Sequence, residues 1–560
     1  MSKFNIPVLN LCHQCIRCKK LWFYIIIIVI YNPCLFSQEE SVEAETAEVE
    51  TEYVTEFVIR SINYKITGKT KESALERLAD FKTGVRFSGW AALEKYLAEK
   101  IQDLYNIRAL EAEESSVHYS LGEAEEDGVI PVYLEISVTD STSLIIIPEP
   151  KYDSNAGFTL SLKARDYNFL GTLAPVKLDL VWGSDDKDRN SLGFLTEITI
   201  PFKAFYHYWI FTSYNEYYYY RTGEPYYNKN VLGLALELPV LDTLFTFGFE
   251  QGLVIHEENT DRIASITRQA DSSEPGLRIR KPPSDINNID EYHDWYLFSK
   301  PYVDWKIPMP LRVGKFGRLV YSPGVYGIVK YQPGGDPGDY RRGPGAGIDQ
   351  EIGFKKINWI GNYREGLGVS LFNKNEYNFF RQDWINSLGF LAEGHIAVSR
   401  FFGISGRLMY TRWFNDFYDL AGDVIRGYKD NELYARERLS LNLDFPVRLI
   451  RFVPSEWKEN PKYRYFDFEQ HWSPFVDLVL ADSSNGNNKP DSNQLIPNKY
   501  QLKKEDLISG AGLEIITFPL KWRSFYLRGS IGFNIQEFHR TKKLPKGIYR
   551  EIYIGMGHYY

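Results

Sequence analysis

The residues from Leu144 to Tyr560 form a long series of short runs in which apolar and polar residues alternate, with polar connections between the runs. Alternation with a period of two places successive side chains on opposite faces of a β-strand. Most runs are long enough to cross a bilayer at the usual tilt, which takes about 9 to 11 residues. No convincing helical pattern occurs in this part of the chain. The sequence therefore predicts an all-β domain over residues 144–560, and an antiparallel transmembrane barrel fits it.

Sixteen runs have a clear strand pattern, and two further segments, Leu144 to Tyr152 and Ile352 to Ile360, are weaker candidates. The pattern alone thus predicts sixteen to eighteen strands. The clear runs are Phe158–Arg165, Val176–Trp182, Leu192–Pro201, Tyr208–Tyr220, Val231–Leu238, Leu244–Ile255, Trp295–Trp305, Leu319–Tyr331, Leu367–Asn373, Leu388–Val398, Ile404–Phe414, Leu439–Phe445, Pro474–Ala481, Gly510–Phe518, Phe525–Ile535 and Ile548–Tyr559.

The connections between the runs fall into two length classes. Short turns, such as Pro239 to Thr243 and Arg400 to Gly403, contrast with long polar insertions. Outer-membrane barrels have short periplasmic turns and long outer loops, so this asymmetry favours that location. Residues 446–471 do not fit the rule if they lie on the short-turn side. The long insertions are residues 257–288, 332–350, 415–435 and 482–505.

The composition supports a barrel that is half lipid-facing and half water-facing. Aromatic residues make up 16% of the chain and charged residues 25%, and the mean hydropathy is -0.34. These values exclude both a helical membrane protein and a disordered chain, because the first needs long apolar runs and the second has few aromatics. The net charge is -8 and no cluster of Lys and Arg forms a patch, which argues against nucleic acid as a partner.

The N-terminus has the pattern of a secretory signal. Basic residues between Lys3 and Lys20 precede an apolar run from Leu21 to Tyr31, and cleavage is predicted near Ser37. An uncleaved anchor is the alternative, although the apolar run is shorter than the roughly 20 residues of a spanning helix. We therefore assign residues 1–37 to a signal peptide. The acidic residues 38–52, which lack aromatics, are predicted to form a disordered linker.

Residues 53–140 have a mixed pattern and predict a small α+β domain. Helical spacing of apolar residues occurs in two segments that lie between strand-like runs. The predicted order is strand, helix, helix, strand, strand, over Phe57–Ile66, Lys71–Asp80, Gly89–Tyr105, Val117–Leu121 and Val129–Val138.

Within the insertion at 415–435, the tetrapeptide Ile425, Arg426, Gly427 and Tyr428 combines a permanently charged fork with a flexible backbone and an aromatic side chain. On a later strand, Phe475 and Asp477 are two residues apart and share one face. If that face is the lumen, Asp477 can accept hydrogen bonds from the Arg426 guanidinium and offset the cost of burying it.

These motifs, taken in order, resemble the BamA/TamA outer-membrane assembly superfamily, whose members combine POTRA domains with a 16-stranded barrel and are also called bacterial surface antigens. The 53–140 domain resembles a POTRA domain. Residues 153–171 are similar to the start of the family's barrel, with a glycine-containing turn, a strand and an Asn-Phe-Leu-Gly turn. Phe475 and Asp477 match the Phe-x-Asp of the wall strand, although the usual following glycine is absent. Tyr560 ends the last strand and resembles the terminal signal of outer-membrane barrels in general, porins included, so it supports location more than activity.

The resemblance implies a barrel in the outer membrane of a diderm bacterium, with the POTRA-like domain in the periplasm. It implies a factor for insertion or translocation of proteins, whose partners are unfolded outer-membrane or secreted clients, membrane lipid and accessory periplasmic lipoproteins. Arg426 would brace the lumen. The barrel would close between its first and last strands, where Pro148 and Pro150 remove two hydrogen-bond donors and weaken the seam.

Other functions remain open at this point. The α+β domain could be a spacer without a client, and the barrel could be a dedicated two-partner-type secretion transporter, a channel or an adhesin. The sequence has no zinc-protease, nucleophile-elbow or phosphate-loop motif, and the nine His do not cluster. We therefore predict no enzymatic activity, no catalytic residues, no cofactor and no metal.

Overall fold

The computed structural model describes most of the chain between residues 56 and 556. The predicted signal peptide, the acidic linker, Tyr428 and Tyr560 lie outside the described residues. The described ranges are 56–125, 128–153, 157–184, 190–220, 227–255, 295–331, 344–379, 382–414, 419–420, 424–427, 434–435, 437–458, 461–481, 502, 507–524, 526–545 and 550–556.

The N-terminal domain contains a four-stranded sheet with the strand order β2-β1-β4-β3. β1 and β4 are parallel, and the two outer strands pair antiparallel with them. The predicted order of elements is present. A three-residue strand between the helices was not predicted, because it is too short to show alternation. The elements are β1 (Glu56–Thr67), α2 (Glu72–Ala79), β2 (Arg86–Ser88), α3 (Trp90–Asn106), β3 (Ser116–Leu121) and β4 (Val129–Thr139).

The core of this domain forms between the helices and the sheet. Leu93, Leu97 and Leu104 repeat at helical spacing on α3 and are buried, as the sequence pattern predicted. They pack in one cluster with Ile59 of β1 and Ile136 of β4, which are both fully buried. The domain therefore has its own hydrophobic core, as an independent folding unit requires.

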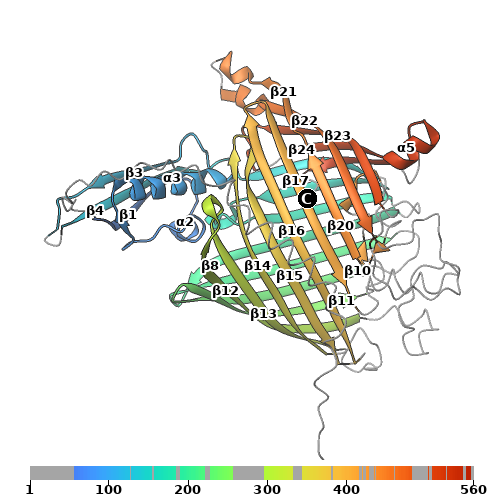
Figure 1. Cartoon of the computed structure of the whole chain (residues 1–560), viewed down its shortest axis with the longest axis horizontal. Coiled ribbons are helices and arrows are strands. Elements are labelled where there is room, and N and C mark those ends of the chain that lie inside the picture. The colour runs from blue at the N-terminus through green and yellow to red at the C-terminus, as the bar shows by residue number, and fades with distance from the viewer. Residues whose placement is uncertain are drawn as a thin grey trace, which may run out of the picture. The chain divides into compact units, whose positions relative to one another are not determined.

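The rest of the chain is a closed antiparallel barrel (Figure 1). Its strands are β5 (Leu144–Asp153), β6 (Gly157–Asp166), β7 (Val176–Ser184), β8 (Asn190–Ala204), β9 (His207–Tyr220), β10 (Tyr227–Val240), β11 (Thr243–Ile255), β12 (Trp295–Arg312), β13 (Arg318–Tyr331), β14 (Gly345–Ile360), β15 (Tyr363–Asn378), β16 (Asp383–Ser399), β17 (Phe402–Trp413), β20 (Glu437–Asp444), β21 (Val447–Phe452), β22 (Phe468–Ala481), β23 (Leu507–Pro519), β24 (Leu527–Asn534) and β25 (Arg550–Met556).

Nineteen strands occur in the barrel over the described residues, but β20 and β21 occupy a single position in the wall. Both pair with β17 and with β22, and only Phe445 and Pro446 separate them. Counting this pair once leaves eighteen positions, an even number as in bacterial single-chain barrels. Eighteen is the upper end of the predicted range, because the two weaker candidates are the strands β5 and β14.

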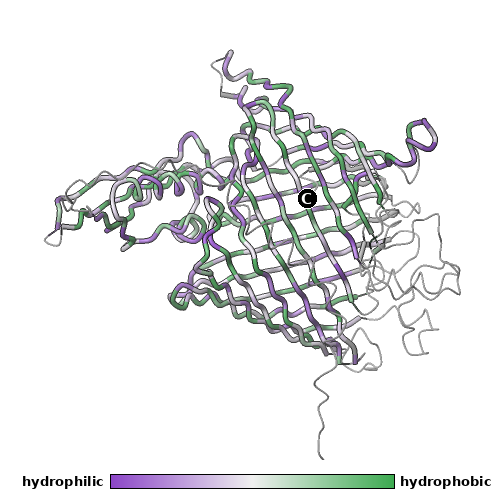
Figure 2. Tube along the Cα trace, viewed as in Figure 1, coloured by the Kyte–Doolittle hydropathy of each residue, from purple (hydrophilic) through white to green (hydrophobic). Residues whose placement is uncertain are grey.

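The wall has an apolar outer face, and hydropathy alternates along the strands (Figure 2). On β10 the side chains of Leu232 and Leu234 are exposed, whereas the alternate residues Gly233 and Ala235 are buried. Exposed apolar side chains recur on other strands, including Phe247 and Phe249 of β11 and Val325 of β13. A closed sheet that leaves no edge and turns apolar side chains outward meets the requirement for spanning a bilayer.

The structure differs from the predictions at three places. A short helix, α5 (Ile535–Thr541), follows β24, and its seven residues are too few to show helical spacing. Its N-terminus is capped by Asn534, whose side chain accepts from the Glu537 N–H. β14 begins at Gly345, inside the predicted 332–350 loop. Residues 446–471 contain β21 and continue the wall. No helix in the described part of the chain is long and apolar enough to cross a membrane.

The outward position of Leu234 gives a first prediction. Leu234→Arg should lower the free energy of unfolding by about 2–4 kcal/mol, because it puts a cation on the lipid side near the middle of the wall. Urea unfolding of the protein in lipid vesicles measures this. Thr212→Arg is the control, since Thr212 neighbours the outward Phe211 and faces the lumen. An equal loss in both variants would contradict the assignment of faces.

Candidate functional site

The loop between β17 and β20 folds back to the inner wall of the barrel. Two short strands, β18 (Asp419–Leu420) and β19 (Tyr434–Ala435), pair antiparallel at its base. Residues 424–427 form its tip, which is almost completely buried: Ile425 is 0% exposed and Arg426 is 1% exposed. Arg426 is therefore not a solvated loop charge. It is among the largest fully buried side chains of the described residues.

Arg426 and Asp477 form a bidentate ion pair. The guanidinium donates from Nε to Asp477 Oδ2 and from Nη2 to Oδ1, both at 2.8 Å. The backbone N–H of Arg426 donates to the same carboxylate at 2.9 Å. Because Asp477 is itself 0% exposed, these three hydrogen bonds replace the solvation that both charges lose on burial.

Two more carboxylates contact the guanidinium. Its Nη1 lies 2.8 Å from Asp444 Oδ1 and 3.4 Å from Glu514 Oε2. Glu514 also lies 2.9 Å from the Nε of Arg528 on β24. The ring of Phe475 lies under the guanidinium, with its centroid 3.6 Å from the central carbon. The tip is thus held in a network of charges and one aromatic face.

Two wall glycines, Gly510 and Gly532, form a glycine floor that lets the tip approach the wall closely. Gly427 has a φ of +98°, and a Cβ at this position would lie 2.7 Å from the backbone of Phe533. A Cβ on Gly510 would lie 2.0 Å from the Arg426 carbonyl oxygen, and one on Gly532 would lie 2.7 Å from the Gly427 nitrogen. Both the tip and the two strands beneath it therefore require glycine here.

Apolar packing fixes the other side of the tip. Val424 and Ile425 form a buried cluster with residues of the loop base and of two wall strands. Asn442 on β20 donates from Nδ2 to the Val424 carbonyl at 2.8 Å and to Asp477 Oδ1 at 2.9 Å. The remaining members of the cluster are Ala435, Val479, Ala481 and Ile508.

The tip also reaches the last strand of the barrel. The backbone N–H of Gly427 donates to Glu551 Oε2 at 3.0 Å. Glu551 lies on β25, which closes the barrel against β5. In the described residues that closing ladder has two pairs, Tyr553 with Asp153 and Ile554 with Tyr152. The site therefore touches the strand that forms the seam.

The structure brings together five of the residues singled out from the sequence: Ile425, Arg426, Gly427, Phe475 and Asp477. The prediction did not include Asp444, Glu514, Glu551 or the glycines of β23 and β24. Isolated glycines within strand patterns were a usable signal for the floor, because they mark close approach of another backbone. Gly510 lies opposite Asp477 in the ladder.

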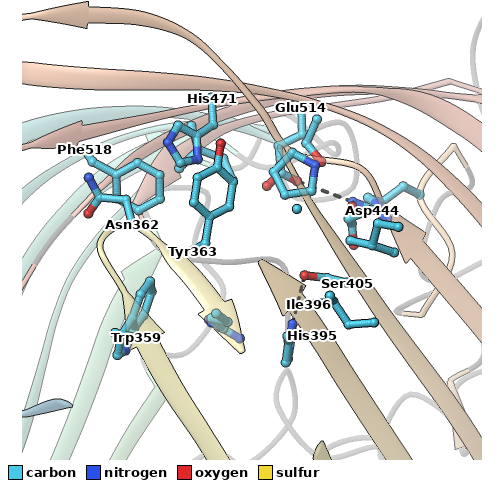
Figure 3. Close-up of a pocket in the computed structure, with 17 residues that line it drawn as sticks. Trp359, Asn362, Tyr363, His395, Ile396, Ser405, Asp444, His471, Glu514 and Phe518 are labelled. Atoms are coloured by element: carbon cyan, nitrogen blue, oxygen red, sulfur yellow. Dashed lines mark hydrogen bonds and ion pairs between the residues drawn. The ribbon is translucent and has the colours of Figure 1, made fainter. Parts of the chain in front are cut away.

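A small cavity lies beside Arg426 (Figure 3). Its volume of about 70 Å³ is well below the ~300 Å³ of ordinary small-molecule sites. Two buried histidines line it. His395 shares a hydrogen bond of 2.8 Å with Ser405, and His471 stacks on Tyr363 at 4.6 Å. No group of three His, Cys, Asp or Glu within the described ranges is arranged to hold a metal. The cavity suits packing of the loop rather than ligand binding.

Comparison with known proteins finds similar solved structures at low sequence identity. CdiB from Acinetobacter baumannii is 12% identical with a TM-score of 0.45, over 89% of this chain and 73% of that one. BamA from Haemophilus ducreyi lacking POTRA domains 1–3 is 13% identical with a TM-score of 0.34, over 90% and 85%. CdiB from Escherichia coli is 9% identical with a TM-score of 0.37, over 96% of each chain. No protein-family model and no curated sequence matches the chain.

Removal of either partner of the buried pair should be strongly destabilising. Arg426→Ala and Asp477→Ala should each lower the free energy of unfolding by about 3–5 kcal/mol, because each leaves an uncompensated buried charge. The double variant should lose clearly less stability than the sum of the losses in the two single variants. Urea unfolding in vesicles measures all three. Arg540→Ala, which breaks the exposed pair with Glu537, should cost less than about 1 kcal/mol. Additive costs for Arg426 and Asp477 would mean that they do not interact.

The glycine at the tip can be tested by labelling. Gly427→Ala should displace the tip, because the left-handed backbone costs about 1–2 kcal/mol for alanine before the clash with Phe533 is counted. In an Ile425→Cys background, the rate of reaction with a water-soluble maleimide should rise by roughly tenfold or more. Gly361→Ala is the control: its φ is +61°, but no atom lies within 4 Å of the added Cβ. An unchanged rate of maleimide reaction in the Gly427→Ala variant would contradict the close approach of the loop tip to the wall.

Proposed function

We propose that the chain is an outer-membrane barrel of the BamA/TamA type, which inserts or translocates protein clients by opening its wall at the seam. The observation that carries this proposal is the buried Arg426–Asp477 pair, in a loop whose tip also contacts the last strand. A loop charge has no need of burial in a simple pore. Burial is explained when the loop has to hold one particular arrangement of the wall.

The loop ties together the C-terminal strands. Its contacts reach β20 through Asp444, β22 through Asp477, β23 through Glu514 and β25 through Glu551. Its Gly427 lies against the β24 backbone. These five strands therefore move as one block for as long as the tip stays in place, and the block ends at the seam.

The seam is the weakest part of the wall within the described residues. The β25–β5 ladder has two pairs, whereas β24–β25 has seven and β5–β6 has ten. Continuing the seam register places Met556 opposite Pro150, which has no N–H to donate. Opening the seam therefore breaks few hydrogen bonds and exposes the edges of β5 and β25.

An opened edge can accept a client strand, because unpaired N–H and C=O groups recruit an extended segment. Pairing in the membrane satisfies the client backbone, so sheet formation itself drives insertion and no nucleotide is required. The N-terminal domain would act as a POTRA domain in the periplasm. Its edge strand β3, Ser116–Leu121, is largely exposed and offers a place for an extended client to add. Membrane lipid and accessory periplasmic lipoproteins are the further partners.

A dedicated secretion transporter would use the same loop and seam for a single client. A channel would instead need an open lumen, which the folded loop occupies in part. Depletion of the protein in the producing cell separates these functions. Broad loss of other outer-membrane barrels supports assembly, and loss of one exported protein supports dedicated secretion. Unchanged outer-membrane content with high single-channel conductance would contradict the proposal.

Locking the seam should abolish function. In Tyr152→Cys with Ile554→Cys, the two cysteines replace residues that are paired across the seam, so oxidation should join β5 to β25. The natural cysteines all precede residue 35 and do not interfere after signal cleavage. The matched control joins β24 to β25 through Ile531→Cys with Ile552→Cys. Loss of activity that is specific to the seam pair and restored by reductant is expected. Full activity of the oxidised seam variant would refute gating.

A further inference from the structure

The hairpin formed by β21 and β22 carries a turn that projects from the barrel wall (Figure 1). β21 pairs with β17 only at Val447, and from Arg448 to Phe452 it pairs with β22 alone. Its turn contains two short 3-10 helices, Pro454–Glu456 and Pro461–Phe466. The hairpin lies at the same barrel end as the short turns, because β22 leads from it toward the long-loop end. These are the residues that did not fit the predicted loop asymmetry.

Aromatic side chains gather on the outer face of this hairpin. On β22, Glu469 and His471 point to the lumen and are buried, so Phe468, the first residue of β22, lies on the opposite, outer face. Phe452 pairs with Phe468, and their rings are 5.5 Å apart. Trp457 packs edge-on against Phe452 at 5.6 Å and remains 70% exposed. The cluster therefore continues the lipid-facing side of the wall.

Cations follow directly after these aromatics. Lys458, Lys462 and Arg464 are exposed, whereas residues 457–466 contain one carboxylate, Glu459. The neighbouring carboxylates have partners within the hairpin. Glu456 forms an ion pair with Arg451 at 2.7 Å, and Asp467 accepts from the Ser455 N–H at 3.1 Å. The tip of the hairpin thus combines exposed aromatic rings with exposed lysine side chains.

We propose that residues 452–458 and 461–468 form an interfacial anchor that binds anionic phospholipid in the leaflet at the short-turn end. The rings of Phe452 and Trp457 lie at the boundary between headgroups and acyl chains, where amphipathic aromatics are favoured. Lys458 and Lys462 contact the phosphates, each contributing the attraction of a basic residue near an anionic surface. The hairpin then fixes the height and tilt of the β20–β25 block in the bilayer. The anchor requires a membrane-embedded wall but not a seam that opens.

A probe on the hairpin tests this proposal in the full-length protein. Phe466→Cys, exposed at 63%, carries a fluorescent label, and the protein is placed in vesicles of phosphatidylethanolamine with or without phosphatidylglycerol. We expect quenching by headgroup-level nitroxide lipid and protection from an aqueous quencher, both stronger with phosphatidylglycerol. Lys458→Glu with Lys462→Glu should lower the docked-to-undocked ratio by roughly tenfold or more. Lys542→Glu with Lys543→Glu, the same charge change after α5 at the long-loop end, should have no effect.

Heat-dependent gel migration confirms that each variant contains a folded barrel, and Trp457→Ser provides a second, uncharged disruption of the anchor. A label that stays fully accessible to the aqueous quencher in both lipid mixtures would overturn the proposal. The proposal would also be overturned if protection of the label from the aqueous quencher did not depend on phosphatidylglycerol or on the Lys458 and Lys462 changes. Protection that appeared only when a periplasmic protein was added would overturn it as well. Since the readout is lipid contact, it is independent of whether seam locking blocks client insertion.

Discussion

The burial of one guanidinium at the inner wall is the constraint on which the rest of the structure depends. A charge that is 1% exposed persists only when its donors are satisfied, and Arg426 has carboxylates on three strands within 3.4 Å. The fork geometry of arginine makes this possible, because it offers five donors in one plane. Lysine at the same position would supply a point charge and lose the bidentate contact with Asp477.

The ion pairs of the Arg426 guanidinium require one particular arrangement of the wall strands. The carboxylates come from strands far apart in sequence, and the glycine floor of β23 and β24 accepts the tip only at close approach. The Gly427 N–H of the same tip donates to Glu551, so the arrangement of the C-terminal strands is linked to the position of the seam strand β25. The short seam ladder and the extensively paired internal block are complementary in the proposed mechanism, because a barrel that opened at one place would have to be firmly held elsewhere. The β21–β22 hairpin adds a contact of that block with the bilayer surface.

Much of this arrangement could be predicted from local sequence, because strand alternation and helical spacing are local properties. The N-terminal element order and the strands of the wall follow from them. The contact of Arg426 with Asp477 was predictable only through resemblance to a family, since 51 residues separate the two in sequence. Asp444, Glu514 and Glu551 resemble any other lumen-facing acids until the register is known, so no local pattern distinguished them. The β21 extension was missed because Pro446 interrupts its alternation and Leu449 lies at a break in its register.

The position of the loop tip is the most direct test of this account. A photo-crosslinking amino acid in place of Ile425, activated in the folded barrel in its membrane, reports which residues surround it. The account predicts adducts within the same chain, mapped to β22 and β23 near Val479, Ala481 and Ile508. Adducts only to other proteins, or a tip that reacts freely with water-soluble reagents outside the cell, would show that the guanidinium does not hold the wall.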